Sequence, residues 1–243
     1  MLNQRFNAIL RNYMNAMFFY LIAFGGLAVS LFAMWRVKAA YAKYSGVPNS
    51  TGLSGAQVAA TILQSSGIYD VQIVPGNQPL GDHYDPINKT LVLSPDNYDG
   101  NSVAAAGIAA HECGHALQHQ AAYAPLTLRM ASVRLVGFAN MTVYILPLLG
   151  LFLHQLYLAL TVMCAAWGII MLFNLVTLPV EFDASARAKR VLPQLGLIRT
   201  QGEAEAVNRV LDAAALTYVA AFVTSLGYFL YYLMVVMGGN RRN

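Results

Sequence analysis

Four long stretches without a charged side chain stand out in the pattern of hydrophobic and polar residues. They cover residues 16–35, 135–153, 156–180 and 213–239. A helix needs about 20 apolar residues to cross the hydrocarbon core of a bilayer. The pattern therefore predicts four transmembrane helices, the second and third joined by a tight turn at His154 and Gln155.

The polar segments between these stretches predict shorter elements. Ser54 can cap a helix over 54–66, the β-branched residues of 71–74 favour a strand, and turn residues favour a β-hairpin over 81–95. Ser102 can cap a helix that runs to Gln120. We expect these elements to form one small α and β region.

A second polar segment, 181–212, follows the third apolar stretch. Pro179 suits the first turn of a new helix, and Pro193 and Gly196 divide the segment. We therefore expect two short helices there.

Composition excludes an ordinary soluble domain. Residues of the set AVILMFWYC make up 57% of the chain and charged residues 11%, against about 45–50% and about 25% in soluble domains. The net charge of +4 comes mainly from residues beside the apolar stretches, where lipid headgroups explain it, and no nucleic-acid motif is present. With Cys113 and Cys164 alone, the chain has no disulfide framework.

The candidate chemistry lies in the HExxH sequence His111–His115 of the helix predicted after Ser102. Residues four apart lie on one face of a helix, so both imidazoles can reach one metal ion. Glu112 lies beside them as a candidate general base for a metal-bound water. Two histidines and a glutamate at this spacing are typical of a zinc peptidase.

A catalytic zinc usually has a third protein ligand. His119 lies about 12 Å from His111 along the helix axis, which is too far for one ion. His154 is predicted on the other side of the bilayer. Glu181, at the exit of the third span, is the favoured ligand; the alternative is a carboxylate stabilised by a helix N-terminus. Glu203 and Glu205, on a helix surface, are weaker candidates.

Four separated motifs in this chain resemble the YugP-type membrane zinc metallopeptidases. They are AAHECGHALQH, the DHYDP hairpin, PVEFDASARA and AAALTYVAA. The resemblance implies a bacterial membrane endopeptidase with one Zn²⁺, held by His111, His115 and Glu181, and with Glu112 as the catalytic base. Related proteases have an ExxAD pattern, but Ser185 replaces its final Asp here, which leaves open what orients the imidazoles.

The predicted fold is mainly α, with four transmembrane helices and a small α+β zincin-like domain that carries a β-hairpin and the HExxH helix. The boundaries that we expect are an N-terminal segment with the first span, the metallopeptidase domain, a transmembrane hairpin, a third-ligand segment, and the last span with the tail. These are residues 1–35, 36–134, 135–180, 181–212 and 213–243.

The expected function is hydrolysis of peptide bonds, in which Glu112 takes a proton from the attacking water. The expected partners are the lipid bilayer, a peptide or protein substrate with membrane proteins among the candidates, and a regulatory membrane protein. The substrate could pair with a strand near 80–84 or 89–93, and His83 or Tyr84 is a candidate for oxyanion stabilisation. The alternative is a non-catalytic membrane scaffold or receptor in which zinc is only structural.

The membrane orientation follows from the basic residues. Eleven of the 15 Lys and Arg fall in 36–134 and 181–212, which four crossings place on one side, and four lie near the termini. The positive-inside rule then predicts a cytoplasmic catalytic side in the inner membrane.

Overall fold

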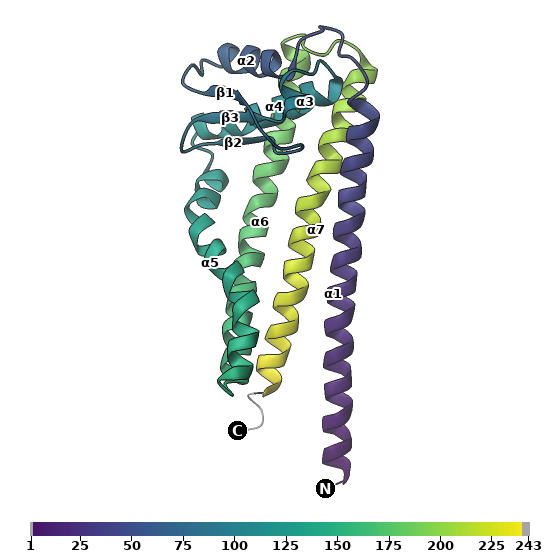
Figure 1. Ribbon diagram of the computed structural model, residues 1–243, viewed down its shortest axis with the longest axis vertical. Coiled ribbons are helices and arrows are strands. Elements are labelled where there is room, and N and C mark those ends of the chain that lie inside the picture. The colour runs from purple at the N-terminus through teal and green to yellow at the C-terminus, as the bar shows by residue number, and fades with distance from the viewer. Residues whose placement is uncertain (1, 240–243) are drawn as a thin grey trace. The chain divides into compact units, whose positions relative to one another are not determined.

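The computed structural model describes residues 2–239 and is mainly helical, with a small mixed sheet (Figure 1). Its elements are α1 (Leu2–Tyr44), α2 (Gly55–Ser65), β1 (Gln72–Pro75), β2 (His83–Asp85), β3 (Thr90–Leu93), α3 (Pro95–Tyr98), α4 (Val103–Gln120), α5 (Ala124–Phe152), α6 (Leu156–Gln194) and α7 (Gln201–Gly239). The predicted fold class is confirmed. The chain forms two compact units.

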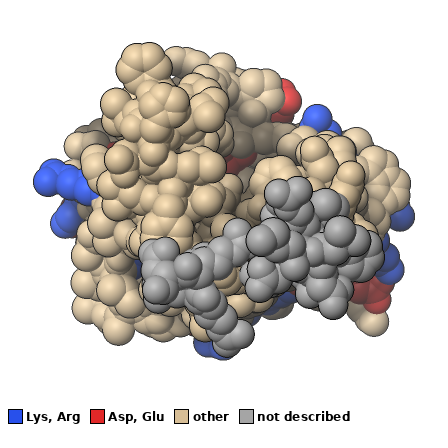
Figure 2. Space-filling view, turned by 90° about the horizontal axis from the view of Figure 1, so that it is seen from below, with Lys and Arg blue, Asp and Glu red and all other residues tan. Residues whose placement is uncertain are grey.

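The first unit comprises Met1–Phe32, Arg129–Val176 and Tyr218–Asn243, and its described residues are almost all helical. Four helices of the described chain are long and apolar enough to cross a membrane, over Ala16–Tyr44, Ala124–Phe152, Leu156–Gln194 and Gln201–Gly238. Large apolar side chains such as Phe138 and Phe152 are exposed on them. Figure 2 shows a face of the molecule on which charged side chains appear mainly at the edges. The large apolar side chains exposed along the helices suit hydrocarbon, as predicted.

Aromatic and polar contacts hold the helices of this unit together. Trp167 of α6 stacks on Tyr228 of α7, with ring centroids 4.4 Å apart. Asn174 of α6 donates to the hydroxyl of Ser225 at 3.0 Å and to the carbonyl of Ala221 at 3.3 Å in α7. Side-chain hydrogen bonds of this kind stabilise helix pairs in lipid because the polar groups have no water to bind.

The second unit comprises Ala33–Leu128 and Thr177–Thr217 and has its own hydrophobic core. Helices α2 and α4 pack against each other, and the sheet packs beside them. The side chains of Ile62, Leu91, Leu93, Leu192 and Leu211 are fully buried in this core. The core thus joins α2, β3, α6 and α7 around α4, which carries the HExxH sequence.

The caps predicted for α2 and α4 are confirmed. Ser54 and Gln57 form a capping box, in which each side chain accepts a hydrogen bond from the other residue's backbone N–H. The Ser102 hydroxyl accepts from the backbone N–H of Ala105 at 3.0 Å. These bonds satisfy donors that helix N-termini leave free and so fix where both helices begin.

The sheet has the strand order β1-β3-β2. β2 pairs antiparallel with β3, which confirms the predicted hairpin, and the Asp85 carboxylate accepts from the backbone N–H groups of Ile87 and Asn88 in its turn. β1 pairs in parallel with β3, with Gln72 opposite Thr90. β3 is therefore the central strand, and β1 and β2 are the edge strands of this sheet. Of the two edge strands, β2 lies in contact with α4.

The prediction of a new helix at Pro179 is wrong. α6 runs without interruption from Leu156 to Gln194, so Pro179 and Pro193 both lie inside it. Proline is tolerated within such helices when neighbouring groups satisfy the freed backbone carbonyl. The predicted break at Gly196 is confirmed, because this residue has φ +65° and separates α6 from α7. The segment 181–212 therefore continues two long helices.

Glu203 was expected on an exposed helix surface, and this expectation is wrong. Its carboxylate is buried and accepts from the backbone N–H groups of Ser50, Arg199 and Thr200 at 2.6, 2.9 and 2.9 Å. It also accepts from the hydroxyls of Ser50 and Thr200. Glu203 thereby ties the loop after α1 to the start of α7, which is a structural role.

We expect Glu203→Ala to destabilise the protein, because it removes the charged acceptor of five hydrogen bonds that join the loop after α1 to the start of α7. The expected loss is about 1–3 kcal/mol of the free energy of unfolding, which lowers the midpoint of thermal unfolding by about 2–4 °C per kcal/mol. Glu205→Ala is the control, since Glu205 is exposed and its carboxylate accepts one hydrogen bond of 3.3 Å from the Gln201 amide, within the same helix turn. Equal midpoints of thermal unfolding for the two variants in detergent would contradict the structural role of Glu203.

Candidate metal centre

Helix α4 presents His111 and His115 on one face. The two rings lie edge to face, with centroids 4.8 Å apart. This follows from the helix geometry, because side chains four residues apart lie one above the other. The alanines before His111 pack tightly and are fully buried, so the helix holds both rings firmly in place.

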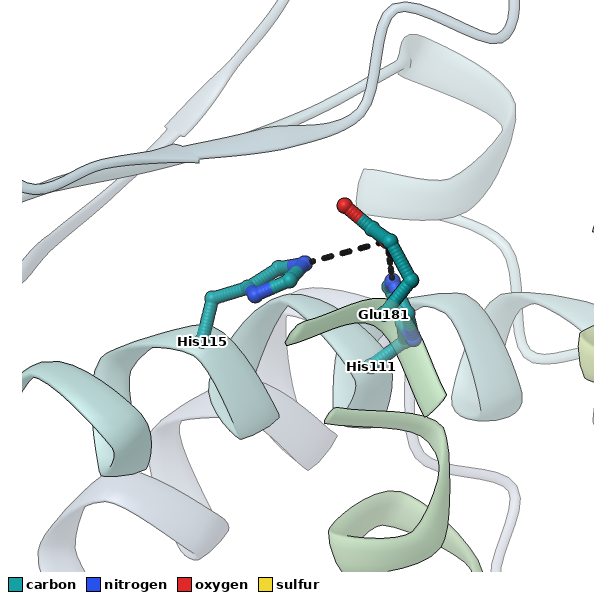
Figure 3. Close-up of side chains that lie close together, drawn as sticks. All are labelled: His111, His115 and Glu181. Atoms are coloured by element: carbon teal, nitrogen blue, oxygen red, sulfur yellow. Dashed lines mark ion pairs between the residues drawn. The ribbon is translucent and has the colours of Figure 1, made fainter. Parts of the chain in front are cut away.

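Helix α6 brings Glu181 to the same point. One carboxylate oxygen, Oε2, lies 3.3 Å from Nε2 of His111 and 3.5 Å from Nε2 of His115 (Figure 3). Glu181 lies inside α6, so the alternative of a carboxylate at a helix N-terminus does not apply. The side chain is almost fully buried. The structure thus brings together His111, His115 and Glu181, which lie up to 70 positions apart in the sequence.

A close contact between the helices makes this meeting possible. A Cβ atom at Gly114 would lie 2.6 Å from the carbonyl oxygen of Ala184 and 3.0 Å from its Cα. Any side chain larger than hydrogen would therefore collide with the backbone of α6. Gly114 and Ala184 mark the place where α4 and α6 approach each other.

The donor atoms fit a single zinc ion. One ligand atom from each of the three residues lies within 4.8 Å of the others. Two ligands bound at about 2.0–2.1 Å to a tetrahedral ion are about 3.4 Å apart, which matches the separations of 3.3 and 3.5 Å. Two imidazoles and a carboxylate are also a donor set that zinc accepts readily. Among the described side chains, this group has three members, which would leave one position for water.

Glu112 is buried beside the two histidines on α4. Burial raises the pKa of its carboxyl, while the neighbouring His111 and His115 act in the opposite direction. A carboxyl in such surroundings holds a proton more tightly than one in water. This property suits a group that accepts and returns a proton.

Hydrogen bonds at the Nδ1 atoms of both imidazoles show what orients the rings, which the sequence left open because Ser185 replaces an Asp. The Ser185 hydroxyl lies 3.1 Å from Nδ1 of His111, at the position where related proteases have Asp. Nδ1 of His115 lies 3.0 Å from Oε1 of Gln118. The Gln118 amide in turn donates to the Asp183 carboxylate at 2.9 Å. Sequence reasoning missed Gln118.

The other candidate residues lie outside the three-residue group. Nδ1 of His119 forms a hydrogen bond of 2.9 Å with the Tyr84 hydroxyl, which agrees with its exclusion as a ligand. Burial, with Asp70 and Asp85 nearby, raises the pKa of Tyr84 to about 12. Nδ1 of His83 lies 2.8 Å from the carbonyl of Gly81. His154 belongs to the helical unit.

Cys113 is a core residue. Its thiol is buried and lies 3.6 Å from the carbonyl of Ala59 in α2. Burial raises the pKa of this thiol well above its usual value, which keeps it protonated and unreactive at neutral pH.

Comparison with known proteins agrees with this geometry. A family described as "Putative neutral zinc metallopeptidase" matches residues 19–237. A relative from Bacillus subtilis (strain 168), named "Putative membrane protease YugP", is 42% identical over 232 residues, which cover 93% of this chain and 100% of the relative. No solved structure matches. With the match extending over most of its length, this chain belongs to the family described as "Putative neutral zinc metallopeptidase".

Proposed function

We propose that the protein is an integral-membrane zinc endopeptidase, in which His111, His115 and Glu181 hold one Zn²⁺ and Glu112 is the general base. The convergence of three ligand atoms from α4 and α6 carries this proposal. Three protein ligands with one open position are typical of catalytic zinc, whereas structural zinc has four protein ligands. The arrangement therefore favours an enzyme over a zinc-stabilised scaffold.

When bound, zinc polarises a carbonyl and lowers the pKa of a water ligand towards about 7. Glu112 then acts on the attacking water: its carboxylate takes one proton as the water oxygen bonds to the carbonyl carbon of the substrate. Glu112 returns this proton to the amide nitrogen as the carbon–nitrogen bond breaks. The second proton of the water also passes to the departing nitrogen, so the products are a carboxylate and an ammonium group, and Glu112 is ionised again.

The substrate backbone is expected to pair with the free edge of β2. An extended peptide can add to an exposed sheet edge through main-chain hydrogen bonds. Of the two strands considered from the sequence, β3 has partners on both sides, so the segment near 80–84 stays the candidate. This choice is supported by the contact of β2 with α4, the helix that carries His111 and His115.

We also propose that the centre lies on the cytoplasmic side of a bacterial inner membrane. This orientation depends on the positive-inside rule and the unequal number of basic residues. Arg5, Arg11, Arg241 and Arg242, which enter that count, lie outside the described side chains. We propose that its substrates are peptides or membrane proteins. A regulatory membrane protein is a further proposed partner.

Removal of the metal is expected to abolish cleavage reversibly. The full chain, purified in detergent, is dialysed against a chelator and assayed with a mixture of quenched-fluorescence peptides. We expect activity to fall to background and to return with one equivalent of Zn²⁺ but not with Mg²⁺, which prefers six oxygen ligands. Undiminished cleavage by protein shown to contain no metal would contradict the proposed function.

A further inference from the structure

The orientation of the Gln118 amide is fixed by its neighbours. The side chain is fully buried, and its nitrogen lies 2.7 Å from the carbonyl oxygen of Val180 and 2.9 Å from the Asp183 carboxylate. Both partners can only accept hydrogen bonds, whereas an amide nitrogen can only donate. The nitrogen must therefore face α6, and the amide oxygen must face His115.

This orientation determines the role of each nitrogen of His115. Because the Gln118 oxygen can only accept, Nδ1 of His115, 3.0 Å away, must carry the hydrogen of that bond. In a neutral imidazole only one nitrogen carries hydrogen, so Nε2 is left with a lone pair. Nε2 is the atom that faces Glu181, at 3.5 Å from Oε2.

We propose that Gln118 is a positioning residue that prepares His115 for zinc, with Asp183 holding Gln118 in the required orientation. This inference rests on the proposed function. Metal-binding histidines usually donate their second N–H to a carboxylate, a carbonyl or water, which fixes the ring and strengthens its binding. Here the acceptor is an amide oxygen, and the carboxylate of Asp183 acts through the amide.

The arrangement also links the two helices. Glu181, Asp183 and Ser185 all belong to α6, whereas both histidines belong to α4. α6 therefore supplies one ligand and also orients both others, through Ser185 to His111 and through Asp183 and Gln118 to His115. Arg187 donates to Asp183 at 2.6 Å and holds that carboxylate in place.

The first test replaces the amide with an apolar group of similar length. We expect Gln118→Met to weaken zinc binding by about 10–100-fold, the usual cost of losing such a supporting group. Gln120→Met, two residues further along α4 at an exposed position, is the control and should leave the affinity within about twofold. Affinity is measured by chelator competition on the full chain in detergent. Wild-type affinity in folded Gln118→Met would overturn the proposal.

A second test removes the carboxylate that holds the amide, and it serves also if Gln118→Met does not fold. Asp183→Ala keeps Gln118 but leaves its nitrogen with the Val180 carbonyl as the remaining acceptor. We expect zinc binding to weaken by about tenfold, the lower end of the usual cost of losing a supporting group. Wild-type zinc affinity in folded Asp183→Ala would overturn the role of Asp183.

These measurements separate the inference from the proposed function, because they record zinc affinity rather than cleavage. If the wild-type chain binds one zinc but cuts no peptide, the proposed enzyme is wrong while the Gln118 effect can still be observed. If the wild type binds zinc and cuts peptides, and Gln118→Met binds zinc equally well, the inference alone fails.

Discussion

Glu112→Gln is expected to abolish peptide cleavage while the purified protein keeps about one zinc per chain. The substitution preserves the shape of the side chain, but an amide cannot take a proton from the attacking water. Loss of a general base costs about 10²–10⁴-fold in rate. The ligands His111 and His115 are unchanged, so metal content should not fall. Cleavage of quenched-fluorescence peptides and zinc content are measured on the same preparation.

Cys113→Ala is the matched control for this variant. The residue is next to Glu112 on α4, but its thiol faces the core and Ala59 rather than the metal centre. We expect normal zinc content and cleavage, with a modest loss of stability from the small cavity. Normal cleavage by Glu112→Gln would remove Glu112 as the base.

Glu181→Ala is expected to release the metal. The side chain lies between the two imidazoles and supplies the only carboxylate of the three-residue group found among the described side chains. Losing a ligand should weaken zinc binding by more than about 100-fold, beyond the usual cost of losing a supporting group. Zinc content after gel filtration should fall towards zero, and cleavage should fall with it.

Glu205→Ala is the control for this experiment. Glu205 was a weaker candidate from the sequence, and it is an exposed residue of α7 outside the three-residue group. Zinc content and cleavage should both stay at the wild-type level. Full zinc occupancy in Glu181→Ala would show that another residue completes the site.

The features that the sequence predicted well depend on local rules. The apolar stretches, the caps at Ser54 and Ser102 and the hairpin turn at Asp85 involve residues close together in the chain. The pairing of His111 with His115 needs only the period of a helix. Glu181 was the one long-range choice, and it depended on counting membrane crossings.

The features that the sequence did not predict depend on contacts between distant segments. Gln118 meets Asp183 across 65 positions, and Glu203 meets Ser50 across 153. Neither pair has a local pattern, because the partners come together only when α4, α6 and α7 pack. The continuity of α6 through Pro179 has the same origin, since the surroundings of the helix outweigh the local preference of proline.

In the pattern HExxH the two positions before the last histidine are left open, but in this chain the residues at these positions, Cys113 and Gly114, have structural roles. Cys113 points into the core, and Gly114 lies at the crossing with Ala184. Exchanging these two residues would put the cysteine side chain between α4 and α6, where it collides with the backbone, and would leave a cavity against α2. The residues at these two positions of the motif thus set how closely α4 and α6 approach each other, and with it the separation between Glu181 and the two imidazoles.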